Sequence, residues 1–166
     1  MSISMYEASA PCFVRILRAL DGILLKAQTY AEERKIDPAV LLSARLYPDM
    51  FALTRQVQIA TDHAKGAMAR LAGVEVPKFE DNEQSFDELR ARIARTIEFV
   101  ESFRPDQING SEEREFTFKA GPRELSFKGQ AYLLSYAQPN FYFHVVTAYD
   151  ILRHNGLSIG KRDYLG

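Results

Sequence analysis

The sequence predicts an all-α protein, a four-helix bundle with a small β-hairpin inserted before the last helix, forming one domain over residues 1–166. Four long segments repeat apolar residues at three- and four-residue steps, the spacing of one buried helical face. One stretch, 115–128, instead alternates polar and apolar residues as strands do. A chain of 166 residues is most simply one domain.

The first helix is expected to begin near Ser2 or Met5 and to run to about Lys35. Pro11 interrupts it early, which predicts either a kink or a later start near Ser9. Downstream of the proline, the buried stripe consists of Phe13, Ile16, Leu17, Leu20, Leu24 and Ala27.

The second long helix is expected from about Asp49 to Ala72, after a short turn that Asp37-Pro38 opens. Gly73 ends it. Its inner face would carry Met50, Leu53, Val57, Ala60, Ala64, Ala67 and Leu71.

The third helix begins with a capping box, in which Ser85 and Glu88 satisfy each other's backbone donors. Its apolar face runs to Phe103, and Pro105 marks its end. Strands are then expected at 115–119 and 124–128, joined by 120–123. A two-stranded hairpin is marginal alone, so it should lie on the bundle.

The last helix is expected from Pro139 to Gly156, because proline suits a first helical turn and glycine follows a last one. Residues 130–137 also favour a helix, so Pro139 should impose a kink or a fresh start. The buried stripe contains Phe141, Val145, Ala148 and Leu152, with Tyr149 on its edge.

Composition limits the classes of function. A net charge of −1 without a long basic run gives no footprint for nucleic acid. No apolar run approaches the ~18 residues that span a membrane. The first residues lack the basic region and apolar block of a signal peptide. Cys12 is the single cysteine and excludes an internal disulfide. Together these features favour a cytoplasmic protein.

Two histidines are the candidate site residues. At 100° per residue, His63 projects to the edge of the second helix's apolar face and His144 to the edge of the last helix's. Both rings would then face one groove, as bundle sites are built from facing helices. Tyr149 is a third candidate ligand-binding residue. The alternative is that each histidine is only a hydrogen-bonded side chain at the edge of the core.

A metal site would need more ligands than these two histidines. Zinc normally takes at least three ligands from the protein. Asp62 projects away from the inner face, and Tyr149 lies on the far edge of its stripe. His154 lies roughly 15 Å beyond His144 along the helix and suits the negative end of the helix dipole.

Blocks spread over nearly the whole chain resemble an uncharacterised domain-of-unknown-function family among the DinB/YfiT-like four-helix bundles. They are Leu41-Leu42, Arg45-Leu46-Tyr47-Pro48-Asp49-Met50, Gln56-Val57-Gln58-Ile59-Ala60, Asp62-His63-Ala64-Lys65, Pro139-Asn140-Phe141-Tyr142-Phe143-His144, Leu152-Arg153-His154-Asn155-Gly156 and Gly160-Lys161-Arg162-Asp163-Tyr164-Leu165-Gly166.

The resemblance implies an up-down-down-up bundle that is often dimeric. It also implies, for many members of the superfamily, a divalent metal held by one histidine of the second helix and a His-x-x-x-His pair on the last. His63 and His144 match the first two ligands. The third falls at Ala148, which cannot ligate, so the metal triad is incomplete. Relatives include thiol-dependent transferases that use bacillithiol or mycothiol.

The main functional hypothesis is a homodimeric small-molecule-binding bundle with a pocket near His63 and His144. The alternative is a divalent-metal-dependent enzyme, with Zn or Ni, of the thiol-dependent transferase type with an altered metal site. A third hypothesis is an interaction subunit that acts through the tail 157–166.

Overall fold

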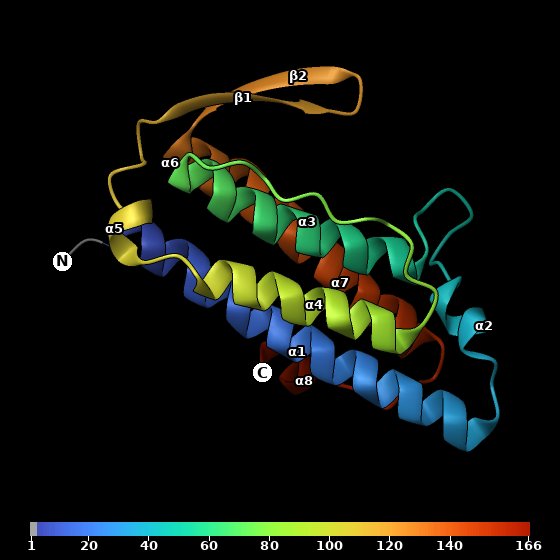
Figure 1. Ribbon diagram of the computed structural model, residues 1–166. Helices are drawn as coiled ribbons and strands as arrows, with labels where there is room; N and C mark the ends of the chain where they lie inside the picture. The colour runs from blue at the N-terminus through green and yellow to red at the C-terminus, as the bar shows by residue number, and fades with distance from the viewer. Residues whose placement is uncertain (1–2) are drawn as a thin grey trace.

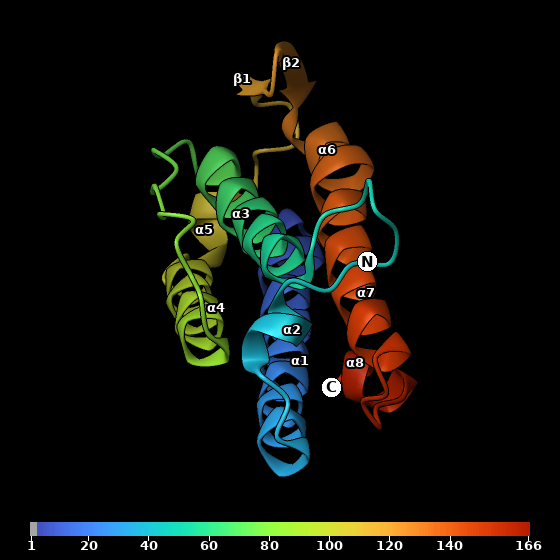
Figure 2. The same ribbon diagram turned by 90° about the vertical axis from the view of Figure 1, so that its right-hand side faces the viewer.

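The computed structural model describes residues 3–166, and four long helices lie side by side in it (Figures 1 and 2). The elements are α1 (Met5–Arg34), α2 (Pro38–Leu42), α3 (Leu53–Ala72), α4 (Phe86–Glu101), α5 (Pro105–Ile108), β1 (Glu115–Ala120), β2 (Arg123–Lys128), α6 (Gly129–Tyr132), the π-helical turn η1 (Leu133–Ala137), α7 (Gln138–His154) and α8 (Lys161–Leu165).

The bundle has the up-down-down-up arrangement. α1 and α7 run in one direction, and α3 and α4 run in the other (Figure 1). Because α3 and α4 are parallel, the 73–85 connection must run the length of the bundle to join them. α3 packs mainly against α7 and α4, and α1 packs mainly against α4 and α8.

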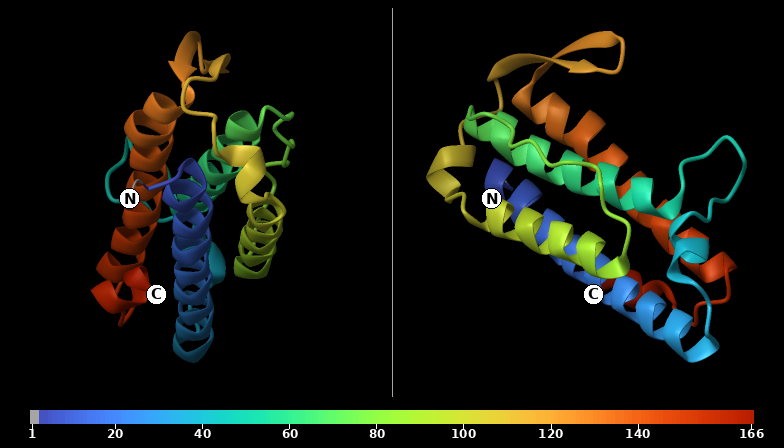
Figure 3. Two further views of the ribbon diagram at one scale, coloured as in Figure 1. Left: turned by 90° about the vertical axis from the view of Figure 1, so that its left-hand side faces the viewer. Right: turned by 45° about the vertical axis from the view of Figure 1, so that its right-hand side comes forward.

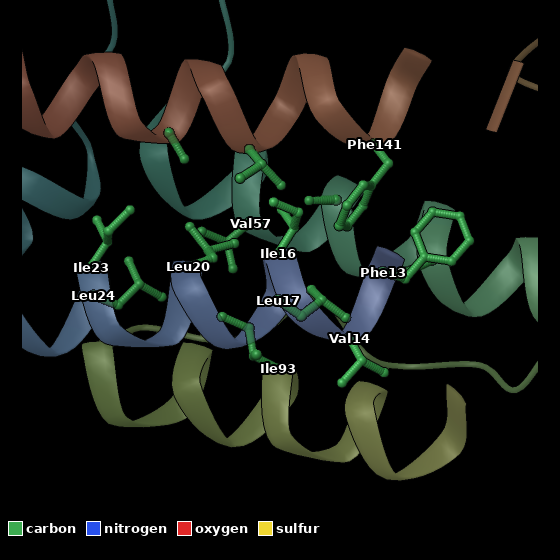
Figure 4. Close-up of a cluster of buried hydrophobic side chains, with 14 of the residues drawn as sticks. Phe13, Val14, Ile16, Leu17, Leu20, Ile23, Leu24, Val57, Ile93 and Phe141 are labelled. Carbon is green, nitrogen blue, oxygen red and sulfur yellow. The ribbon is translucent and has the colours of Figure 1, made fainter. Parts of the chain in front are cut away.

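The core is built around α1. Its stripe of fully buried side chains faces Val57 of α3, Ile93 of α4 and Phe141 of α7 (Figure 4). The rings of Phe13 and Phe141 meet edge to face, with centroids 4.9 Å apart. That geometry is favoured by the aromatic quadrupoles. The core therefore joins three helices to α1 through contacts that the apolar periodicity predicts.

α1 continues through Pro11, and the later start near Ser9 is wrong. A capping box between Ser4 and Glu7 fixes the true start at Met5. Ser2, the earlier expected start, lies outside the described residues. Pro11 has no N–H to donate to the Glu7 carbonyl one turn earlier. The Cys12 thiol lies 3.6 Å from that carbonyl and donates to it instead.

The expected start of the second long helix at Asp49 is also wrong, because α3 begins at Leu53. The Arg45 guanidinium donates to the carbonyl of Met50 at 3.0 Å and holds residues 45–50 as a turn. Met50, expected on the inner face, is half-buried in this loop.

The predicted kink or fresh start at Pro139 takes the form of a π-helical turn within a continuous helix. α6, η1 and α7 follow one another from Gly129 to His154. The Gln138 N–H bonds the carbonyl of Leu133, five residues earlier. The extra residue in this turn lets the helix pass Pro139, and such turns are frequent at functional sites.

The hairpin lies over one end of the bundle, beside α6 and the end of α3 (Figures 1 and 3). Its strands are antiparallel, with Phe116 opposite Phe127 and Phe118 opposite Leu125. The Phe118 and Phe127 rings lie 5.6 and 5.3 Å from Tyr136 of η1, centroid to centroid. The hairpin thus gains the support that an isolated pair of strands lacks.

The tail folds back on α1. Leu157 and Ile159 are buried, and Arg15 Nε donates to the Leu165 carbonyl at 2.8 Å. Asp163 pairs with Lys26. Among residues 3–166, each helix is too short or too polar to cross a membrane.

Candidate functional site

The fold brings His63 and His144 together. α3 and α7 run antiparallel, and the two imidazole rings stack with centroids 6.0 Å apart and planes 12° from parallel. Each histidine lies at the edge of its helix's apolar face, so a small rotation of either helix would separate the rings. Their functional role stays a prediction, but the geometry it requires is present.

A buried glutamine fixes the tautomer of His144. The Gln56 amide nitrogen donates to the Phe51 carbonyl at 3.0 Å, which leaves Gln56 Oε1 as an acceptor. That oxygen lies 2.6 Å from His144 Nδ1, so Nδ1 carries the proton and donates. His144 Nε2 therefore keeps its lone pair. The Gln56 side chain is 1% exposed. In the sequence, a glutamine on the buried face of a helix, two turns before His63, was the signal that could have indicated this hydrogen bond.

Both rings are uncharged at neutral pH. Burial, then the His144 charge, then Arg70 lower the pKa of His63 to about 4. Burial, then Arg55, lower the pKa of His144 to about 4. Two neutral imidazoles offer one donor and one acceptor nitrogen each.

A cavity of about 320 Å³ opens beside His63, between α3, the strand β1 and the α6–η1 segment. Its walls combine aromatic, cationic, apolar and acidic side chains. They are those of Arg55, Ile59, Asp62, His63, Arg70, Phe118, Lys119, Ala120, Tyr132 and Tyr136. His144 lies behind His63 rather than in the wall. A larger cavity of about 570 Å³ lies between α1 and Gly166, away from the histidines.

The candidate residue Tyr149 is not brought to this cavity. Its side chain is half-buried against the core, five residues beyond His144 on α7. Two other tyrosines, Tyr132 and Tyr136, line the cavity instead, and the sequence did not lead us to expect them there. Tyr136 meets His63 edge to face at 5.8 Å, and Tyr132 stacks on Tyr136 at 5.8 Å. Their spacing of four in a helical stretch just before Pro139 was the available signal.

Arg70 closes the far end of the cavity. Its Nη1 donates to the Tyr132 hydroxyl at 3.0 Å, and its guanidinium carbon lies 4.2 Å from the Phe118 ring centroid. The side chain folds back over Gly66, where a Cβ would overlap Nη1. Glycine at position 66 is thus what lets the guanidinium reach this place.

The donor set does not fit the metal site that the resemblance implies. Ala148 presents a methyl group at the third ligand position. Asp62 borders the cavity, but its carboxylate is held by Arg92 and Lys65, each at 2.9 Å. Within residues 3–166, no three His, Cys, Asp or Glu side chains are grouped so as to hold a metal ion.

Comparison with known proteins gives the family. Residues 5–165 match the domain of unknown function DUF1993. The chain belongs to this family. It also resembles the crystal structure of a DinB family member protein from Shewanella denitrificans, with a TM-score of 0.87 and 40% identity, over 97% of this chain and 91% of that one. No curated protein matches the chain. A DUF1993 chain with a DinB-like fold agrees with the resemblance inferred from the sequence blocks.

Proposed function

We propose that this protein is a dimeric small-molecule-binding bundle, with its ligand site in the cavity that His63 borders and His144 supports. The observation that carries the proposal is the stacked pair of neutral imidazoles beside an aromatic cavity of about 320 Å³. Ligand pockets are typically apolar clefts with a few convergent polar groups and histidines of perturbed pKa. A cytoplasmic location is part of the proposal and rests on the single cysteine.

Exposed apolar side chains support the dimer. Tyr47 and Phe51 of loop 43–52 are 65% and 56% exposed, and Phe143 of α7 is 57% exposed. Gln56 joins the two regions, because its side chain bonds both the Phe51 carbonyl and His144. Large apolar groups gathered on a surface mark interaction sites.

Light scattering tests the dimer. The double variant Phe51→Ser, Phe143→Ser should halve the mass of a wild-type dimer. The matched control is Leu25→Ser, which removes a similarly exposed side chain from α1. A monomeric wild type, or a dimer that survives the double variant, would reject this surface.

The ring signals of the three histidines test the ligand site. A fragment mixture is screened by NMR, and binding fragments should shift the His63 and His144 signals together. His154 is exposed at the end of α7 and serves as an internal control that should not move. Fragments that bind without moving His63 would place the ligand site elsewhere.

The second candidate, a divalent-metal-dependent enzyme of the thiol-dependent transferase type, is favoured by the hydrogen bond from His144 Nδ1 to Gln56. Metal-bound imidazoles usually donate their other nitrogen in this way. The ion would need a third ligand from outside the two histidines. Elemental analysis for Zn and Ni in protein purified without chelator tests it, with His144→Ala beside the wild type. Absence of stoichiometric metal in both samples would remove this candidate.

A further inference from the structure

Arg70 carries a positive charge that no carboxylate balances within the part of the chain described. None of the ion pairs among residues 3–166 includes it. Its contacts are the Tyr132 hydroxyl and the faces of Phe118 and Tyr132. A guanidinium has five N–H donors in a planar fork, and this hydrogen bond uses one of them. The others remain available at the cavity wall.

Arg55 and Asp62, which also border the cavity, are already paired. Arg55 bonds Asp81 at 2.6 Å, and Asp62 is shared between Arg92 and Lys65. Lys119 adds a further positive charge on the exposed side of β1. The field in the cavity is therefore positive on balance, which favours an anion.

The rest of the wall is apolar and flat. Phe118, Tyr132 and Tyr136 present aromatic faces or edges, and Ile59 adds an aliphatic side chain. A volume of about 320 Å³ is at the small end of ligand sites, so a nucleotide-sized molecule would not fit. Arginine binds carboxylates with two parallel hydrogen bonds, and aromatic walls favour a planar apolar body.

From these contacts we propose that the cavity binds a small aromatic monocarboxylate, with its carboxylate on the Arg70 guanidinium and its ring against Phe118 and Tyr136. The neutral His63 ring contributes a hydrogen bond beside the carboxylate. This inference rests on the proposed ligand site and adds to it the class of ligand.

Gly66 supplies an independent test of the Arg70 contact. An alanine there would force the Arg70 guanidinium away from Tyr132, although none of the residues that line the cavity is substituted. Alanine also favours a helix more than glycine does. Gly66→Ala should thus weaken carboxylate binding, while the helix gain of alanine offsets part of the stability lost with the Arg70–Tyr132 hydrogen bond.

The experiment titrates four probes at pH 7 by calorimetry and by the His63 ring signals. Benzoate and phenylacetate should bind at least about tenfold more tightly than benzamide and phenylacetamide, since charge-assisted hydrogen bonds are the stronger kind. Arg70→Gln should abolish that preference, and Arg70→Lys should keep part of it. Gly66→Ala should reduce it in a protein that still unfolds in one cooperative transition. Arg34→Gln, which removes an exposed arginine stacked on Tyr30, is the control and should change nothing.

The outcomes separate this inference from the proposal beneath it. Amides that bind as tightly as carboxylates would overturn the anion site and leave the ligand site standing. A carboxylate preference that survives Arg70→Gln would also overturn it. If no probe moves the His63 signals, the anion site fails, and the fragment screen then decides whether the ligand site fails with it.

Discussion

The guanidinium groups of Arg92, from α4, and Arg70, from α3, lie on different sides of α3 and have opposite surroundings. Arg92 of α4 is fully buried, and its guanidinium contacts the carboxylates of Asp62, Asp81 and Glu83 at 2.9–3.0 Å. Arg70 is half-buried and meets aromatic rings and one hydroxyl. The Arg92 guanidinium has several hydrogen-bond acceptors around it, whereas the Arg70 guanidinium has N–H donors without an acceptor among residues 3–166.

The difference separates a structural role from a binding role. Arg92 also donates to the Glu80 carbonyl at 3.1 Å and to Thr61 at 2.7 Å, so it fastens the 73–85 connection to α3 and α4. Phe79 of that connection is covered by the cations of Lys65 and Arg95, at 4.1 and 3.8 Å. The Arg92 guanidinium thus has three carboxylates, a carbonyl and a hydroxyl as partners. On the hairpin side of α3, the charge of Arg70 has no carboxylate partner, and the lone pairs of His63 and His144 accept no hydrogen bond among residues 3–166. A ligand could bind to these groups.

The largest effect should come from breaking the ion pairs of Arg92. Arg92→Met takes the cation from Glu83, whose side chain is 7% exposed, and removing one member of a buried ion pair costs about 3–5 kcal/mol. Asp62 and Asp81 are partly exposed and keep Lys65 and Arg55 as partners. Urea unfolding measures the change in the free energy of unfolding. Arg70→Gln breaks no ion pair and should cost less, because the charged hydrogen bond that it loses is of the kind worth about 1.5–3 kcal/mol. Equal costs for the two variants would contradict the contrast.

The next effect is on the pH dependence of stability. The folded-state pKa of His63 and His144 is about 4, below the ordinary 6.5, so the unfolded chain binds more protons between these values. Stability should rise with pH across that window, by up to about 1.4 kcal/mol per pH unit for each histidine, and the contribution is lost below pH 4. Unfolding curves at pH 4.5–7 measure the slope. His63→Gln should reduce the slope by the share of one histidine and leave the share of His144.

A smaller and more specific effect concerns Gln56. In Gln56→Glu, a carboxylate replaces the amide oxygen 2.6 Å from His144 Nδ1. An opposite charge at this distance favours the imidazolium, so the pKa of His144 should rise by at least about one unit. An NMR titration of the ring signals measures it. In Gln56→Met, which supplies no charge, the pKa of His144 should stay below 6.5. A pKa of His144 unchanged in Gln56→Glu would mean that the hydrogen bond does not form.

The sequence predicts much of the fold because apolar periodicity and capping chemistry are local. The capping box of Ser85 and Glu88, the hairpin strands and the course of α7 follow from neighbouring residues. The predictions at Ser9 and Asp49 were wrong because a hydrogen bond from a side chain to the backbone, which apolar periodicity does not encode, decided between two local structures. The Cys12 thiol at the Glu7 carbonyl lets α1 pass Pro11, and Arg45 holds the turn that delays α3.

The site could be predicted only in part. Helical projection places His63 and His144 at the edges of two faces, and the packing of α3 on α7 makes those edges meet. The π-helical turn changes the register before Pro139, which a regular period of 3.6 does not anticipate, and Tyr136 within this turn contacts Phe118 of the hairpin. The role of Arg70 depends on Tyr132, 62 residues away, so neighbouring residues gave no signal of it.

The smallest expected change in stability gives the sharpest test of the contrast between the two sides of α3. Gly66→Ala and Gly22→Ala each replace a glycine within a helix by alanine, which favours the helix by up to about 1 kcal/mol. In Gly66→Ala the loss of the Arg70–Tyr132 hydrogen bond opposes this gain. The space around Gly22 is open, whereas a Cβ at position 66 overlaps the Arg70 guanidinium. Displacing that charge should raise the pKa of His63 in Gly66→Ala, because Arg70 helps to lower it. Gly22→Ala should stabilise α1 and leave the pKa of His63 at about 4. If both variants leave the pKa of His63 unchanged, Arg70 does not act on the histidine side of the cavity.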